Sequence, residues 1–448
     1  MKKPGTKIPT ARLISFISGI RKDPQKYFYK LFKEKGDLVR LPYPKKTYVI
    51  SHPLLAKEFL IRANRELGKK DIINNRMRNV FGNGIITSEG EVWLRNRKTL
   101  SGSFHQSSIE KYELNIKSQI GLRIKEWESA PENGTMLILQ HEMKRLALSI
   151  MASNIIGTDL SNQLDPIILM LEKGARILSH SLPVKFTFGP VSKSEKQLAE
   201  ILNQIELAGK RIIAGKRKNY QADGLDMFSL FFRHEKETGE IIPDGLLLDE
   251  FKSLLIAGYF TTSNALSWTF IELAKNPEWM QKISHEIDSE KKHHTDSTGK
   301  NQRLSFMNAF IHESLRTSTP VWSAWYSVDA DIQANGHKFS RGSNVMVDLF
   351  NIHHHPEFFK SPEQFDPGRF LNGETGKISE AFMPFGHGPR KCLGVNLAMS
   401  IITSTVEMVL SQFDVVVSDA HKIDSTIMVT RSPKGPVKFI LRKRTNPA

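Results

Sequence analysis

The chain has 448 residues, of which 40% are hydrophobic, and it contains a single cysteine. This length allows a substantial buried core, and a lone cysteine excludes an internal disulfide and a cysteine-based zinc or iron–sulfur site. The net charge is +16, but the sequence shows scattered Lys and Arg and no recognisable nucleic-acid-binding module, so we expect no nucleic-acid partner.

The N-terminal part contains a short apolar patch, Leu13 to Ile20, which serines and a glycine interrupt. This patch is too weak for a signal peptide, and no stretch approaches the roughly 20 apolar residues that span a bilayer. We therefore expect a soluble chain without a transmembrane anchor, located in a reducing cytoplasm. Residues 36–66 then alternate and break like a small sheet, with strands over 37–41 and 47–50.

Residues 91–320 have mostly helical periodicity. Near the start of this region Trp93 and Arg97 lie four residues apart, so they share one face of a helix. Taken alone, Trp93 is more often a half-buried core aromatic.

The longest helical stretch runs from Asp249 to Lys275, is mostly apolar and contains no proline. It includes the sequence Ala257-Gly258-Tyr259-Phe260-Thr261-Thr262. A glycine inside a helix costs about 1 kcal/mol relative to alanine, so Gly258 calls for an explanation.

A further amphipathic helix is predicted over residues 304–315 and carries Glu313 and Arg316 on one face. As an exposed ion pair these two residues would contribute little stability. Residues 327–350 again have the pattern of strands and turns, with glycines at the turns.

Three consecutive histidines, His353-His354-His355, suggest a metal site at first sight. Successive residues point in different directions on any regular element, so we favour the interpretation that the three do not share one ion. The last stretch, Thr426 to Leu441, is predicted as a terminal hairpin that turns at residues 433–436.

The single cysteine lies in Phe385-Gly386-His387-Gly388-Pro389-Arg390-Lys391-Cys392-Leu393-Gly394, and an apolar helical run over 395–410 follows. The three glycines allow positive φ angles and close backbone approach around the sulfur. Backbone N–H groups, Arg390 and the start of the following helix are expected to lower the pKa of the thiol. One thiolate at a large, open-faced metal centre indicates haem iron.

The pattern Phe-x-x-Gly-x-Arg-x-Cys-x-Gly resembles the haem-binding signature of the cytochrome P-450 family of haem-thiolate monooxygenases. All of its fixed positions are present: Phe385, Gly388, Arg390, Cys392 and Gly394. The family's Trp-x-x-x-Arg, Glu-x-x-Arg and Pro-Glu-x-Phe-x-Pro-x-Arg-Phe motifs also occur, the last at residues 362–370. The resemblance implies the P-450 fold, mainly α with small β-sheets (α+β), as one triangular, helix-rich domain over residues 1–448 with a long central helix above the haem.

The same resemblance implies that Cys392 is the axial iron ligand of haem b. It also implies that Trp93, Arg97 and Arg390 hold the haem propionates. Tyr326 stands near a position where many relatives have Arg or His, and it offers one neutral hydrogen bond instead. The other haem-binding positions are Phe385, Gly386 and Ala257.

Glu313, Arg316 and Arg369 match a structural triad of the family. The resemblance implies that this triad is buried and pins the segment before the cysteine loop. Two guanidiniums around one carboxylate require a bidentate geometry that Lys does not supply.

The catalytic positions lie in the long helix. By resemblance, Gly258 marks a distortion that leaves a groove for dioxygen, and Thr261 supplies a hydroxyl for proton delivery. The family usually has an acid where this chain has Phe260, which cannot carry a proton. Alternatively, Phe260 packs outward in the core and water reaches Thr261 by another route.

The primary hypothesis is a monooxygenase that inserts one atom of dioxygen into a lipophilic small molecule. No flavin or iron–sulfur domain fits within the chain, so an acidic ferredoxin or flavodoxin with its reductase is expected to supply electrons. Charge would steer this partner to the face near Arg390 and Lys391, bordered by Arg97 and Lys98. We expect a monomer.

Two rival functions stay open. Phe260 favours a haem-thiolate enzyme with atypical oxygen activation, such as a peroxygenase or a coupling or rearranging enzyme. A haem sensor is the other rival, against which Thr261 and Gly258 argue. The expected pocket is mostly apolar and draws on Leu178, Leu182, Phe186, Phe188, Leu255, Tyr259, Val321, Trp322, Ile427 and Met428.

Overall fold

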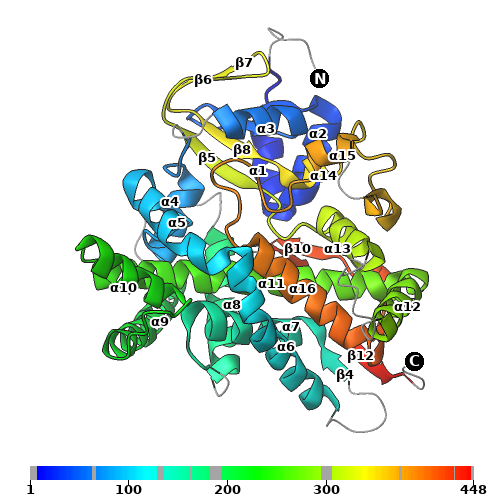
Figure 1. Cartoon of the computed structure of the whole chain (residues 1–448). Helices are drawn as coiled ribbons and strands as arrows, with labels where there is room; N and C mark the ends of the chain where they lie inside the picture. The colour runs from blue at the N-terminus through cyan, green and yellow to red at the C-terminus, as the bar shows by residue number, and fades with distance from the viewer. Residues whose placement is uncertain are drawn as a thin grey trace.

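The computed structural model of the chain describes residues 8–62, 67–128, 136–160, 163–181, 193–293, 305–372, 376–427 and 429–444. Helices predominate in this part of the chain, and the strands form small separate sheets (Figure 1). The predicted mainly α class with small β-sheets is confirmed. Among the described residues, no helix combines the length and apolar character needed to cross a membrane.

The described helices range from short turns of a few residues to three elements of more than twenty residues, α6, α9 and α11. In chain order they are α1 (Leu13–Lys22), α2 (Pro24–Lys35), α3 (Pro53–Arg62), α4 (Ile72–Phe81), α5 (Gly90–Phe104), α6 (Gln106–Glu128), α7 (Leu139–Met151), the π-helix η1 (Ala152–Ile156), α8 (Leu164–Ser181), α9 (Lys193–Lys218), α10 (Met227–Thr238), α11 (Asp244–Lys275), α12 (Pro277–His293), α13 (Ser305–Thr317), α14 (Leu349–His353), the 3₁₀ helix η3 (Pro367–Phe370), α15 (Gly376–Ala381), α16 (Val395–Leu410) and the 3₁₀ helix η4 (Ala420–Lys422).

The largest sheet has the strand order β1-β2-β8-β5-β3, in which β2 and β8 are parallel. Smaller sheets pair β4-β12-β9, β6-β7 and β10-β11. The strands are β1 (Leu38–Leu41), β2 (Thr47–Ile50), β3 (Leu67–Gly68), β4 (Met136–Ile138), β5 (Ala324–Val328), β6 (Ile332–Ala334), β7 (His337–Phe339), β8 (Asn344–Val347), β9 (Phe413–Val417), β10 (Ser425–Ile427), β11 (Arg431–Pro433) and β12 (Lys438–Lys443).

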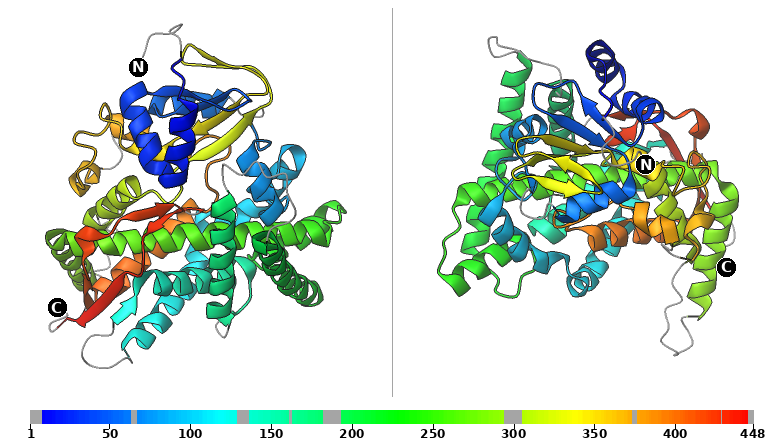
Figure 2. Two further views of the ribbon diagram at one scale, coloured as in Figure 1. Left: turned by 180° about the vertical axis from the view of Figure 1, so that it is seen from behind. Right: turned by 90° about the horizontal axis from the view of Figure 1, so that it is seen from above.

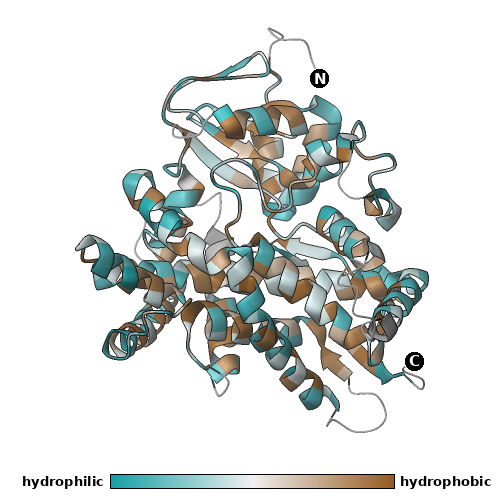
Figure 3. Cartoon of the chain, in the orientation of Figure 1, coloured by the Kyte–Doolittle hydropathy of each residue, from teal (hydrophilic) through white to brown (hydrophobic). Residues whose placement is uncertain are grey.

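Helix α11 crosses the molecule as the long green element in both views of Figure 2, and it is buried on nearly all sides along most of its length. It begins at Asp244 rather than at the predicted Asp249. Pro243 directly precedes it and Asp244 lies in its first turn, and acidic residues in a first turn favour a helix start. The main core surrounds this helix, whereas outer helices such as α9 and α10 show mixed colouring in Figure 3, as amphipathic helices do.

The N-terminal sheet region differs from the prediction in one element. Strands β1 and β2 are present, but Pro53–Arg62 forms the helix α3 instead of continuing the β-pattern. Leu55 and Phe59 lie four residues apart and are both fully buried. Burial of this one helical face therefore favours a helix over a strand in the segment. The strands and turns predicted over 327–350 are confirmed.

The predicted terminal hairpin around residues 433–436 is wrong. The hairpin forms earlier, between β10 and β11, with Thr426 opposite Ser432. The strand after residue 436 leaves this pair and lies between β4 and β9 in another sheet. Two prolines, Pro433 and Pro436, have no N–H to donate to a ladder between them, and this explains why the pairing does not continue through the expected turn.

Candidate functional site

The loop that carries the single cysteine is closed by its own backbone. The N–H of Cys392 donates to the carbonyl oxygen of Phe385 over 2.9 Å. Gly386 and Gly388 have φ angles of 73° and 72°, a region that favours glycine. A Cβ at Gly388 would also lie 2.7 Å from the carbonyl oxygen of Leu60, so this position is closed to larger residues.

The thiol itself differs from the prediction in its pKa. Burial raises the pKa of Cys392 above its ordinary value, although the Gly394 backbone, Arg97 and Lys391 lower it. The residue as a whole is nevertheless exposed. The predicted low pKa of the protein's own thiol is thus wrong, since desolvation exceeds the effect of the cations. A bound metal cation reverses this balance and deprotonates a coordinating thiol.

Three predicted cofactor-binding residues lie together beside this loop. Trp93 and Arg97 share a face of α5, and the Arg97 guanidinium lies 5.6 Å from the indole ring. The guanidinium of Arg390 lies 4.2 Å from the same ring, and Arg97 Nη2 donates to the carbonyl oxygen of Lys391 over 3.0 Å. Burial, with a smaller contribution from neighbouring Arg97, lowers the pKa of Arg390 to about 10.

A third cation, Lys69, lies near Arg390, and no sequence motif identifies it. Its Nζ donates to the carbonyl oxygen of Trp325 over 2.9 Å and lies 4.3 Å from the ring of Tyr326. Burial lowers the pKa of Lys69 to about 8, with Arg390 lowering it too. Burial raises the pKa of Tyr326 to about 12, so its hydroxyl stays neutral, as predicted.

These residues fit a haem that carries two carboxylates. Nη1 of Arg390 is buried and has no hydrogen-bond partner in the described structure, which is costly for a charged donor. A carboxylate there would satisfy it and would offset the repulsion among Arg97, Arg390 and Lys69. The donor set, one thiol beside several cationic donors, matches an iron centre in an anionic macrocycle.

The predicted triad is present as a set of contacts. Arg316 forms a two-pronged ion pair with Glu313, with Nε–Oε2 at 2.6 Å and Nη2–Oε1 at 2.7 Å, and both side chains are fully buried. Arg369 Nε reaches Glu313 Oε1 at 3.3 Å. Arg316 Nη1 also donates to the carbonyl oxygens of His353 and Pro362. One guanidinium thus connects α13 to two later segments of the chain.

His353 extends this network to the cysteine loop. Its Nε2 accepts the N–H of Met383 over 3.0 Å, and its Nδ1 lies 2.6 Å from the hydroxyl of Thr319. The Met383 carbonyl oxygen in turn accepts the N–H of Gly386. His354 instead contacts the Phe350 carbonyl oxygen through Nδ1, so these neighbouring histidines point apart, as predicted.

On α11, three of the predicted site residues are less buried than the rest of the helix centre. Every residue from Glu250 to Leu273 is buried except Ala257, Gly258 and Thr261, which are half-buried and neighbour one another on the helix. Thr261 Oγ1 donates to the Ala257 carbonyl oxygen over 2.6 Å.

The distortion expected at Gly258 is absent, since α11 continues as an unbroken α-helix through this point. A Cβ at Gly258 would overlap the side chain of Met151. Close approach of α7 therefore explains this glycine. Met151 is followed directly by the π-helix η1, a feature that often lies at functional sites.

Phe260 is a core residue by its contacts. It is 5% exposed, and its ring meets that of Tyr259 edge-on at 4.6 Å. The outward-packing interpretation fits these observations. Of the predicted pocket residues, Leu255 and Tyr259 are also buried in the core, Val321 is exposed, and Trp322 packs 5.9 Å from Phe28. The remaining ones that lie outside the described part, or whose side chains do, are Leu178, Leu182, Phe186, Phe188 and Met428.

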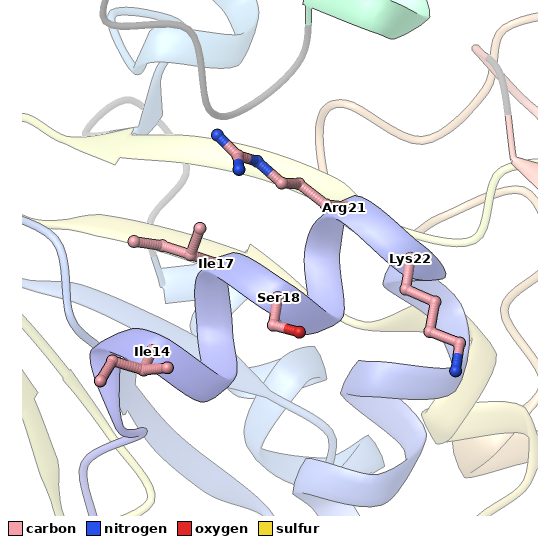
Figure 4. Close-up of a pocket in the computed structure, with 5 residues that line it drawn as sticks. All are labelled: Ile14, Ile17, Ser18, Arg21 and Lys22. Carbon is pink, nitrogen blue, oxygen red and sulfur yellow. The ribbon is translucent and has the colours of Figure 1, made fainter.

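A surface hollow on α1 lies apart from these residues (Figure 4). It is lined by Ile14, Ile17, Ser18, Arg21 and Lys22. Figure 4 shows these side chains along one helix. The lining contains no carboxylate, thiol or histidine, so this hollow lacks the chemistry of the cysteine site.

Comparison with known proteins agrees with this geometry. The cytochrome P450 family model matches residues 3–439. Cyclooctat-9-en-7-ol 5-monooxygenase of Streptomyces melanosporofaciens is 27% identical over 387 residues, 84% of this chain and 82% of that protein. Pentalenene oxygenase of Streptomyces avermitilis is 26% identical over 432 residues, 94% and 93% of the two chains. Protein LUTEIN DEFICIENT 5 of Arabidopsis thaliana is 25% identical, over 94% of this chain and 74% of that protein. The chain belongs to the cytochrome P450 family of haem-thiolate monooxygenases.

Proposed function

We propose that this P450 inserts one atom of dioxygen into a lipophilic substrate of terpenoid type, with electrons from a separate acidic ferredoxin or flavodoxin and its reductase. The observation that carries the proposal is the placement of Arg97 and Arg390 around Trp93, with Arg97 bonded to the backbone of Lys391 directly before Cys392. This cluster suits a thiolate-ligated haem, for which we propose haem b.

Bound haem b supplies the redox chemistry of oxygen activation. The chain's own residues bind and orient it: Cys392 Sγ ligates the iron, and the guanidinium of Arg390 holds a carboxylate. We also assign Phe385, Gly386 and Ala257 to the haem contact, by their places in the loop and on α11. The Thr261 hydroxyl, on the half-buried face of α11, holds a proton for transfer.

The substrate class rests on the relatives' names and on the apolar composition of the chain's candidate pocket. Two of the relatives act, by name, on pentalenene and cyclooctat-9-en-7-ol, which are uncharged, unsaturated compounds. A library of terpenoids, fatty acids and aromatic compounds screened for ligand-induced shifts of the haem spectrum tests this class. Shifts confined to fatty acids would contradict it.

We further propose that residues 1–448 act as one domain, as a monomer in the cytoplasm. The family match over residues 3–439 supports the single domain. Gel filtration of the haem-loaded protein tests the monomer.

The second candidate is a haem-thiolate enzyme with atypical oxygen activation. It is favoured by Phe260, which stands beside Thr261 without a carboxylate. Turnover with peroxide alone, compared with turnover on NADPH and a ferredoxin, separates the two functions. Faster turnover with peroxide would favour this second candidate.

The ligand assignment gives the first prediction. Cys392→Ser should abolish the thiolate-type Soret band of the reduced carbon-monoxide complex, because the chain has no other thiol. Lys391→Gln, at the neighbouring exposed position, is the matched control and should keep the band. A Cys392→Ser protein that retained it would refute the assignment.

A further inference from the structure

A second cluster of metal-ligating side chains lies outside the cysteine site, where the largest sheet meets the segment after α14. Asp37 directly precedes β1, His52 follows β2, and His355 follows α14. One ligand atom from each residue lies within 4.8 Å of the other two. His52 and His355 are 2% and 5% exposed, and Asp37 is half-buried.

His52 has a ring nitrogen that this environment does not use. Its Nδ1 is buried and has no hydrogen-bond partner in the described structure. Its Nε2 lies 3.7 Å from Glu357 Oε2. Burial lowers the pKa of His52, which favours the neutral imidazole that binds metals. Histidine ligands of metals commonly direct their second nitrogen to a carboxylate in this way.

His355 faces the same group of atoms. Its Nε2 lies 3.2 Å from Asp37 Oδ1, and its Nδ1 accepts the N–H of Glu357 over 3.3 Å. A hydrogen bond between His355 and Asp37 accounts for that pair, but it does not account for the unused nitrogen of His52. Metal binding through Nε2 requires the other tautomer of His355, which gives up both the hydrogen bond to Asp37 and the long contact from Glu357. The bonds of the ion to His355 and Asp37 would replace the first of these.

We propose that Asp37, His52 and His355 bind Zn²⁺, with Glu357 orienting His52. Two imidazoles and a carboxylate are common zinc ligands, and three protein ligands leave a fourth position for water. Tetrahedral zinc with bonds of about 2.0–2.1 Å places its ligand atoms roughly 3.3 Å apart, so small side-chain rotations close the site. The ion would join the ends of β1, β2 and the segment after α14, and it is distinct from the haem iron.

Zinc and iron content of untagged, haem-loaded protein tests the proposal after equilibration with Zn²⁺ and removal of free metal. We expect about one saturable zinc per haem iron and a higher melting temperature with Zn²⁺, since a ligand that binds only the folded state stabilises it. His52→Gln and His355→Gln should lose both effects. Glu357→Gln should weaken zinc binding by about 10–100-fold. His421→Gln, which removes an exposed histidine of η4, is the control.

Native zinc uptake in both histidine variants, or no saturable zinc in the native protein, would overturn the proposal. If either histidine variant has reduced haem content, the zinc affinity of Asp37→Asn is the deciding measurement. This substitution keeps the side-chain size and lowers the charge of the ligand set. Unchanged zinc affinity in Asp37→Asn would then count against the site.

Discussion

Phe260 is the residue at which family resemblance and packing lead to opposite expectations. A carboxylate at this position would restore the usual proton-delivering acid beside Thr261, but the side chain is 5% exposed and packs against Tyr259. Phe260→Glu would bury an unpaired acid, and we expect it to destabilise the fold by about 2–5 kcal/mol. Thermal unfolding of the haem-loaded protein measures this.

Phe260→Leu is the matched control and should cost less, because it removes volume without adding a polar group. Product formed per NADPH consumed is measured on the same proteins. A Glu variant as stable as the Leu variant, with higher coupling, would show that residue 260 faces the oxygen site. It would also favour the candidate function with atypical oxygen activation.

At the scale of elements, Arg316 connects α13 to two segments that precede the cysteine loop in the chain. Its guanidinium reaches Glu313 and three backbone carbonyl oxygens. Lys cannot reproduce this fork, so Arg316→Lys should leave Glu313 poorly paired and cost about 3–5 kcal/mol. Little haem-loaded protein is the expected result, measured as haem per chain.

Arg369→Lys provides the comparison within the same triad. Arg369 meets Glu313 through one contact at 3.3 Å and is more exposed than Arg316, so its loss should be milder. Equal haem loading in the native protein and both variants would contradict a structural role for the triad.

The loop after α4 is held to α11 by a buried acid, Glu250, which predicts a pH dependence. Its carboxylate accepts the N–H of Ile85 over 3.0 Å and the side chain of Asn96. Burial raises its pKa from 4.5 to about 7. The folded state therefore holds this proton more tightly than the unfolded chain, and the stabilisation is full below pH 4.5 and lost as pH rises through 7.

The melting temperature of the native protein should fall more between pH 5 and pH 8 than that of Glu250→Gln. The Gln variant resembles the protonated acid and removes the titration, so the comparison uses the pH slope and not the baseline stability. The difference between the two slopes is the relevant measurement. Parallel slopes would show that this carboxyl group does not link stability to pH.

The elements that sequence predicts best are those whose local pattern agrees with their packing. Helix α16 has the predicted bounds, because an apolar run directly follows the glycine-rich loop. Helix α3 is not predicted from the sequence, because its helical pattern covers only a short segment and follows directly after two strands. Lys69 and His353 act through partners distant in sequence, Trp325 and Met383. Such contacts depend on tertiary structure, which periodicity and motifs do not encode.

At the scale of the whole molecule, half of the net positive charge is concentrated in one part of the chain and is not evenly scattered. Residues 1–35 contain ten Lys or Arg and two Asp or Glu, so they carry +8 of the net +16. Lys391 in the cysteine loop and Lys98 on α5 are also exposed, and Arg97, next to Lys98 in the chain, donates to the Lys391 carbonyl oxygen. Charge substitutions in the two regions therefore separate attraction of a partner to the cysteine loop from attraction by the net charge of the whole molecule.

Electron transfer from an acidic ferredoxin should slow as ionic strength rises, because the Debye length falls from about 10 Å at 0.1 M to about 3 Å at 1 M. Steering can raise association rates by about 10–10³-fold. Lys391→Glu should therefore lower the second-order rate at low salt more than Lys22→Glu, which changes the net charge equally on exposed α1. Stopped-flow reduction of the ferric protein under carbon monoxide gives the rate. Equal effects of the two substitutions would indicate attraction by net charge, whereas a rate independent of salt would exclude electrostatic steering by either region.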